Sequence, residues 1–117
     1  MTSRATLYRW DELALDKVTE MVSRKVIAGA ETVLTQAYFK KGTIVPLHAH
    51  STEVMVYVLQ GAMRVQMPGV DAIIREGEVL VVPPDVSHQV ESLDDTFVLT
   101  VEGRLNARPA PSTSRTQ

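Results

Sequence analysis

From residue 20 onward, apolar and polar residues follow a period of two, which is typical of β-strands rather than helices. Residues 53–61 and 77–85 are apolar on both faces, so we expect these strands to be covered on both sides. The predicted strands cover residues 20–29, 31–39, 53–61, 63–76, 77–85 and 96–103, and the segment 63–76 holds two strands joined at Pro68-Gly69.

Short strands at roughly ten-residue spacing, separated by Gly and Pro turns, predict an all-β sandwich or barrel. Residues 9–18 predict one or two helical turns before the strands, with Asp11 as a possible cap. The length of 117 residues favours one domain, which we place at residues 1–105. Residues 106–117 are polar and rich in Pro, Ser and Thr, which predicts a disordered tail.

The strand at 53–61 also predicts an oligomer. In a small barrel one of its faces lines the core, and the outward row of Met55, Tyr57 and Leu59 must meet another sheet or a second subunit. We therefore expect a homodimer.

Composition and charge exclude several classes of partner. A net charge of −2 and a pI near 5.9 give no electrostatic reason to expect nucleic acid or an anionic membrane. No apolar stretch reaches the length of a spanning helix, and the polar N-terminus lacks a signal-peptide core, so we expect a cytoplasmic protein. The chain has no cysteine, and any metal must therefore be held by nitrogen and oxygen.

The chain's three histidines are His48, His50 and His88. Side chains two apart on a strand point to the same face, so His48 and His50 aim into the same space. His88 supplies a third nitrogen if its strand runs beside theirs. A lone histidine is more often a surface or core residue, but three at metal-compatible points and none elsewhere favour a metal site.

The spacing around these histidines resembles the two motifs of the cupin family. The first motif is matched by Gly42, then five intervening residues, then His48-Ala49-His50, and finally the closing Gly61. Gly77, five residues, Pro83 and His88 fit the second, with Asp85 in place of Gly and Ser92 in place of Asn. The resemblance covers residues 8–103. It implies a cupin jelly-roll β-barrel (double-stranded β-helix) with a short N-terminal segment and a metal in its mouth.

The family's fourth ligand, Glu or Gln, falls on Val54 when counted back from Gly61. Strand parity from His50 gives the same position. The Glu53 side chain would reach the metal site only through a β-bulge. We therefore predict three imidazoles and no carboxylate around a divalent transition metal, which can be Zn, Fe, Ni, Mn or Cu. Because each imidazole must be neutral to bind, the site should weaken as the pH falls through about 6.

Within the family, the chain is most similar to the small KdgF-type cupins of pectin degradation. The likeness rests on residues 22–50, 56–61 and 81–101. It implies conversion of 4,5-unsaturated uronates to linear keto-uronates. However, Thr100, Glu102 and Asn106 stand where that group has Asp, Phe and Arg. Together with Val54, these changes argue against uronate ring opening itself.

Three functions remain open from the sequence, each with a small-molecule ligand. The first is a metal-dependent lyase or isomerase acting on a small oxygen-rich molecule such as a sugar acid. The second is a three-His iron dioxygenase for diketones or thiols, and the third is a non-catalytic metal- or ligand-binding cupin. Glu102 is the candidate catalytic base if Val98, Thr100 and Glu102 face the barrel. Gln36 and Arg64 can each either line the pocket or be ordinary exposed strand residues, and we favour the second interpretation for both.

Overall fold

The computed structural model describes residues 4–104, which form ten β-strands and one short helical turn. In chain order these elements are η1 (Trp10–Glu12), β1 (Asp16–Lys17), β2 (Val22–Ala28), β3 (Thr32–Phe39), β4 (Ile44–His48), β5 (Val54–Gln60), β6 (Ala62–Met67), β7 (Val70–Arg75), β8 (Val79–Val82), β9 (His88–Ser92) and β10 (Thr96–Gly103). All the predicted strands are present, and β6 and β7 are joined at Pro68-Gly69 as expected.

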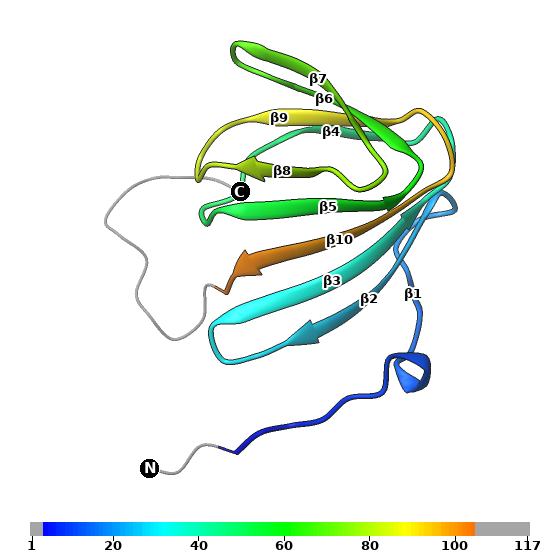
Figure 1. Ribbon diagram of the computed structural model, residues 1–117, viewed down its shortest axis with the longest axis vertical. Coiled ribbons are helices and arrows are strands. Elements are labelled where there is room, and N and C mark those ends of the chain that lie inside the picture. The colour runs from blue at the N-terminus through cyan, green and yellow to red at the C-terminus, as the bar shows by residue number, and fades with distance from the viewer. Residues whose placement is uncertain (1–3, 105–117) are drawn as a thin grey trace.

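The strands form two antiparallel sheets that face each other (Figure 1). One has six strands in the order β1-β2-β3-β10-β5-β8, and the other has four in the order β4-β9-β6-β7. Neighbours in each sheet are mostly distant in sequence, as in a jelly roll, so the all-β jelly-roll prediction is confirmed. Pro46 lies in β4, the edge strand of the smaller sheet, where a missing N–H is tolerated.

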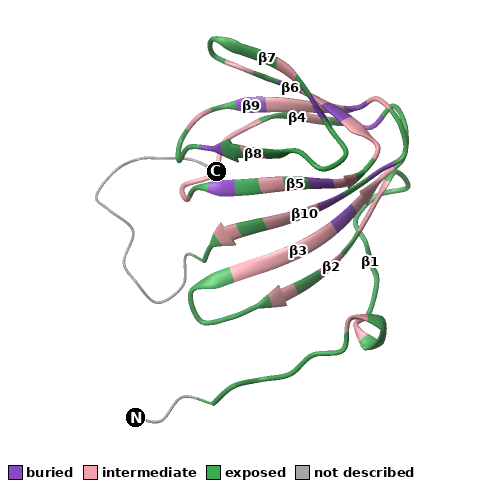
Figure 2. Cartoon of the chain, viewed as in Figure 1, coloured by how far each residue is buried: buried purple, intermediate pink, exposed green. Residues whose placement is uncertain are grey.

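The hydrophobic core lies between the two sheets. Its buried cluster consists of Ala37, Val58, Met63, Val65, Ile74 and Val98. Val58 and Val98 pair across β5 and β10 and are almost completely inaccessible to solvent. Figure 2 shows the buried positions at intervals along the strands, with exposed positions between them. This alternation is the pattern that the sequence predicted, because side chains on a strand point to opposite faces in turn.

The segment before β2 differs in part from the prediction. Residues 10–12 form a single 3-10 turn, with Arg9 at its N-cap and no side-chain cap bond. Asp11 lies inside the turn, so the prediction of Asp11 as a cap was wrong. The Trp10 indole N–H donates to Gln36 Oε1, and Lys25 Nζ donates to the Trp10 carbonyl oxygen at 2.9 Å. These bonds hold the turn against the outer face of β2 and β3.

Between residues 4 and 104, no helix is long and apolar enough to cross a membrane. The predicted disordered tail, residues 106–117, lies outside the described residues.

Candidate metal centre

The three histidines come together at one end of the jelly roll. His48 is the last residue of β4 and pairs directly with His88, the first residue of β9. His50 lies two residues beyond, in the loop that leads to β5, and not in the strand itself as parity had assumed. One ring nitrogen from each histidine lies within 4.8 Å of the others. The ring centroids of His48 and His88 are 4.3 Å apart, and those of His48 and His50 are 4.9 Å apart.

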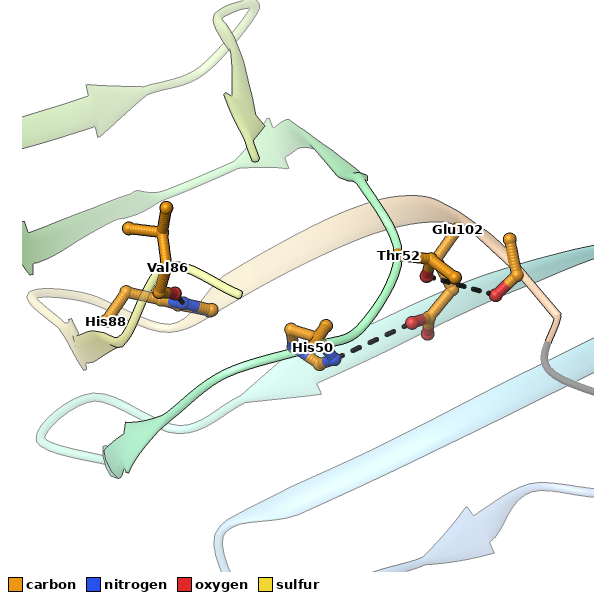
Figure 3. Close-up of polar contacts among 6 residues, drawn as sticks. His50, Thr52, Val86, His88 and Glu102 are labelled. Atoms are coloured by element: carbon orange, nitrogen blue, oxygen red, sulfur yellow. Dashed lines mark hydrogen bonds and ion pairs between the residues drawn. The ribbon is translucent and has the colours of Figure 1, made fainter. Parts of the chain in front are cut away.

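Each imidazole turns its Nδ1 toward an oxygen of the chain. His48 Nδ1 lies 2.7 Å from the Pro46 carbonyl oxygen, and His88 Nδ1 lies 3.0 Å from that of Val86. His50 Nδ1 faces Glu102 Oε2 at 3.6 Å. Figure 3 shows the His88 and His50 contacts. Because a carbonyl oxygen only accepts, the proton of a neutral His48 or His88 sits on Nδ1, and Nε2 keeps its lone pair for an ion.

Burial favours the neutral imidazoles that a metal requires. It lowers the pKa of His50 below the ordinary 6.5; the Glu102 charge opposes this effect, and His48 reinforces it. Burial also lowers the pKa of His88, while the bond to Val86 raises it and the other two histidines lower it further. Neutral, convergent imidazoles with oriented Nδ1 atoms are a donor set that fits a divalent transition metal.

Two backbone contacts hold the histidine segments together. The Asp85 N–H donates to the His50 carbonyl oxygen at 2.7 Å, which ties the turn before β9 to the loop after β4. Asp85 has a φ of 65°, a left-handed conformation that Asp tolerates better than most residues. On the other side, Thr52 Oγ1 donates to the Gly103 carbonyl oxygen at 3.1 Å, next to Glu102 (Figure 3).

The histidines line a cavity of about 590 Å³ between the two sheets. Its walls are mostly aliphatic and come from β2, β3, β5, β8 and β10 on one side and β4, β6 and β9 on the other. Val54 is buried in this wall at 5% exposure. Glu53 is exposed and lines a separate, smaller depression instead. The ladder of β5 with β8 is regular from Val54 onward, so no bulge turns Glu53 inward.

Glu102 lies in the same cavity as the histidines. Val98, Thr100 and Glu102 all line it, which settles the orientation of β10 that the sequence had left open. Glu102 pairs with Val54 across β10 and β5, and its side chain is 29% exposed. Its distance of 3.6 Å from His50 is longer than a hydrogen bond, so the carboxylate is close to the imidazole without being fixed to it.

Residues 36–103, which contain this site, match the cupin domain family. The chain belongs to the cupin family. A comparison with curated proteins finds no match.

Three solved structures place this cupin among similar folds. KdgF from Halomonas sp. superposes with a TM-score of 0.78 at 23% identity, covering 86% of this chain and 96% of that one. An RmlC-like cupin from Shewanella frigidimarina superposes with a TM-score of 0.79 at 19% identity, covering 92% of this chain and 97% of that one. A predicted oxalate decarboxylase from Thermotoga maritima superposes with a TM-score of 0.73 at 21% identity, covering 86% of this chain and 100% of that one. At these identities the likeness establishes the fold alone.

Sequence reasoning missed one residue of this cupin's cavity, Arg24. It lines the cavity from β2 together with Val22, and its side chain is 48% exposed. The signal was present in the sequence, because Arg24 alternates in phase with Val22 and Val26 on one face of the strand. Gln36 and Arg64 lie outside the cavity lining, but both are half-buried and not exposed, and they are bonded to Trp10 and Asp71 respectively.

Proposed function

We propose that this cupin is a metal-dependent enzyme of the lyase or isomerase type that acts on a small oxygen-rich molecule, such as a sugar acid. One observation carries the proposal: the Glu102 carboxylate lies in the same cavity as the three-histidine cluster, 3.6 Å from His50. A proton acceptor beside a cluster suited to a metal is the pairing that acid–base chemistry on a chelated substrate requires.

His48, His50 and His88 are the proposed ligands, because their ring nitrogens converge and their Nδ1 atoms face oxygens of the chain. A dication held by these three neutral ligands would keep its full charge and would supply Lewis-acid polarisation of substrate oxygens. Imidazole ligation is compatible with Zn, Fe, Ni, Mn and Cu. The family's carboxylate position is occupied by Val54, which contributes no charge and no donor atom.

Glu102 is the proposed general base. Its carboxylate accepts a proton from a substrate carbon or hydroxyl held in the cavity. The same group then returns that proton to another position of the substrate in an isomerisation, or to the departing oxygen in an elimination that forms a C=C bond. It also acts on His50 through its negative charge, which favours the Nδ1–H tautomer of that ring. Because its distance to His50 exceeds hydrogen-bond length, the carboxylate is free to turn toward a substrate.

The resemblance of residues 22–50, 56–61 and 81–101 to the KdgF-type cupins supports a sugar acid as the oxygen-rich molecule. The residues at the corresponding positions of β10 support a different reaction, because Thr100 provides no carboxylate where KdgF-type chains carry Asp. We therefore propose related acid–base chemistry centred on Glu102, not uronate ring opening itself.

A second candidate is a three-His iron dioxygenase acting on a diketone or thiol. The observation that favours it is the aliphatic wall around the histidines, to which Val54, Val56 and Val82 contribute. An apolar pocket next to open coordination positions suits oxygen chemistry, and it leaves no carboxylate ligand at the ion.

Metal analysis of protein purified without an affinity tag tests both candidates. We expect about one divalent ion per chain, and loss of that ion in a His48→Ala/His50→Ala double variant. Zn, Ni or Mn without oxygen uptake would support the lyase or isomerase, whereas iron with oxygen uptake on diketones or thiols would support the dioxygenase. Metal content unchanged in the double variant would overturn the site. Loss of ultraviolet absorbance from an unsaturated uronate would reinstate ring opening.

A further inference from the structure

We propose that Arg24 is an anion-binding subsite at the end of the cavity remote from the histidines. The cavity would then take an amphipathic ligand with an oxygen-chelating head, an apolar body and an anionic far end. This inference rests on the proposed function, because the metal would hold the head of the ligand. It narrows the substrate class from oxygen-rich molecules in general to those that carry their polar groups at the two ends, and it replaces the sugar acid, the example given under the proposed function, with a ligand that has an apolar body.

Strand register places Arg24 far from the histidines within one continuous cavity. Glu102, beside His50, pairs with Val33, which in turn pairs with Ala28 on β2. Arg24 lies four residues before Ala28 on the same strand, which corresponds to about 13 Å along the strand direction. Both Arg24 and Glu102 line the cavity, so one ligand can reach from the histidine end to the arginine.

Asp16 holds Arg24 in a way that leaves donors free. On the neighbouring strand β1, Asp16 pairs with Arg24, and its Oδ2 accepts a bond from Arg24 Nε at 3.2 Å. Among the described residues, the two terminal nitrogens of Arg24, Nη1 and Nη2, have no protein partner. A guanidinium fixed at Nε presents these two nitrogens side by side, the geometry that binds a carboxylate through both of its oxygens.

The wall between the two ends is unsuited to a polyhydroxylated body. Within the described chain, Arg24 and Glu102 are the charged side chains of the lining apart from the histidines. Most of the remaining lining is aliphatic, and on the larger sheet the polar exceptions in the middle are the hydroxyls of Thr35 and Thr100, which pair across β3 and β10. Sugar hydroxyls buried here would lack most of their partners, whereas methylene groups would be covered well.

Calorimetric titration of the Zn²⁺-loaded protein with three hydroxamates tests the inference. Acetohydroxamate carries the chelating head alone, octanohydroxamate adds an apolar chain, and suberic acid monohydroxamate ends that chain in a carboxylate. We expect octanohydroxamate to bind at least about tenfold more tightly than acetohydroxamate, because its chain lies along the aliphatic wall. The carboxylate-ended probe should bind about fivefold more tightly again, through Arg24.

An Asp16→Asn/Arg24→Gln double variant removes both charges of the far end and should abolish the advantage of the carboxylate-ended probe over octanohydroxamate. The control is Arg75→Gln, which removes one exposed positive charge outside the cavity lining and should leave that ratio unchanged. Equal affinities for the two long probes, or a ratio that survives in the double variant, would overturn the Arg24 subsite alone. Failure of acetohydroxamate to bind would overturn the metal-dependent function together with the inference.

Discussion

The Glu102 carboxylate and the His50 imidazole affect each other through charge more than through a hydrogen bond. At 3.6 Å the contact is too long for a hydrogen bond, and both side chains are about one-third exposed. The negative charge stabilises the imidazolium form and raises the pKa of His50, but burial has the larger and opposite effect. The result is an imidazole that stays neutral, and therefore able to bind a metal, at a more acidic pH than a free histidine.

Replacing Glu102 by Gln should therefore lower the pKa of His50 further. The substitution removes the one interaction that favours the protonated ring and keeps the side-chain shape, so burial and the His48 charge then act unopposed. An NMR titration of the histidine ring signals in metal-free protein measures the change. Glu53→Gln is the matched control, because Glu53 is exposed and lies outside the histidine cavity. A His50 pKa that is equal in the wild type and in E102Q would contradict this assignment of the charge effect.

At the scale of the elements, the turn between β5 and β6 depends on the absence of a side chain. Gly61 has a φ of 95°, and a Cβ placed on it would lie 2.5 Å from the Asp95 carbonyl oxygen and 2.6 Å from Thr96 Oγ1. Thr96 is completely buried, and its hydroxyl donates to the Asp94 carbonyl oxygen at 2.8 Å. The glycine that closes the first cupin motif therefore allows the start of β10 to pack against this turn.

Gly61→Ala should destabilise the fold by about 3 kcal/mol or more, because it adds a clash with backbone to the strain of a positive φ. Gly69→Ala is the matched control: Gly69 has a φ of 75°, but a Cβ there meets nothing within 4 Å. It should cost only about 1 kcal/mol, from the left-handed conformation itself. Urea denaturation of both variants measures the difference. Equal losses would show that contact with Asp95 and Thr96 contributes nothing.

The strands were predictable because alternation is a local signal. Each strand predicted from the alternation appears near its expected position. The count back from Gly61, together with parity, placed Val54 in the wall and Glu53 outside it. Parity also reduced β10 to two orientations, and the structure selects the one that turns Glu102 inward. The order of strands in the sheets is not a local property, so the pairing of β4 with β9, which brings His88 to His48, required the family resemblance.

Two features of the site were not predicted from the sequence. His50 lies in a loop, where its direction is fixed by the bond between Asp85 and its own carbonyl and not by strand parity. Arg24 was not singled out from the sequence, because on one face of an alternating strand it looks like any other charged residue. Its guanidinium is bonded to Asp16 on the short strand β1, and a two-residue strand has no recognisable sequence pattern.

At the scale of the whole molecule, the outer face of the larger sheet carries a continuous apolar surface. Its exposed members lie on β5, β8 and β10, at exposed fractions between 36% and 56%: Met55, Tyr57, Val79, Val81, Phe97 and Val101. Register makes them neighbours, since Met55 pairs with Val81 on one side and with Val101 on the other. A monomer rarely exposes a contiguous patch of this kind. A second copy of the chain is the partner that we expect to cover it.

Tyr57→Glu should therefore convert a dimer to a monomer. Tyr57 lies between Val79 and Leu99 across the ladders of β5, so a carboxylate there would be placed in the middle of the buried face without a partner. Analytical ultracentrifugation of the wild type should give the mass of two chains, and that of Y57E the mass of one. The matched control is Ile73→Glu, which places the same charge at an exposed apolar position on β7, in the other sheet, and should leave the dimer intact. A wild-type protein that sediments as a monomer would contradict the expected dimer. A dimer that is disrupted by I73E but not by Y57E would place the subunit interface on the smaller sheet instead.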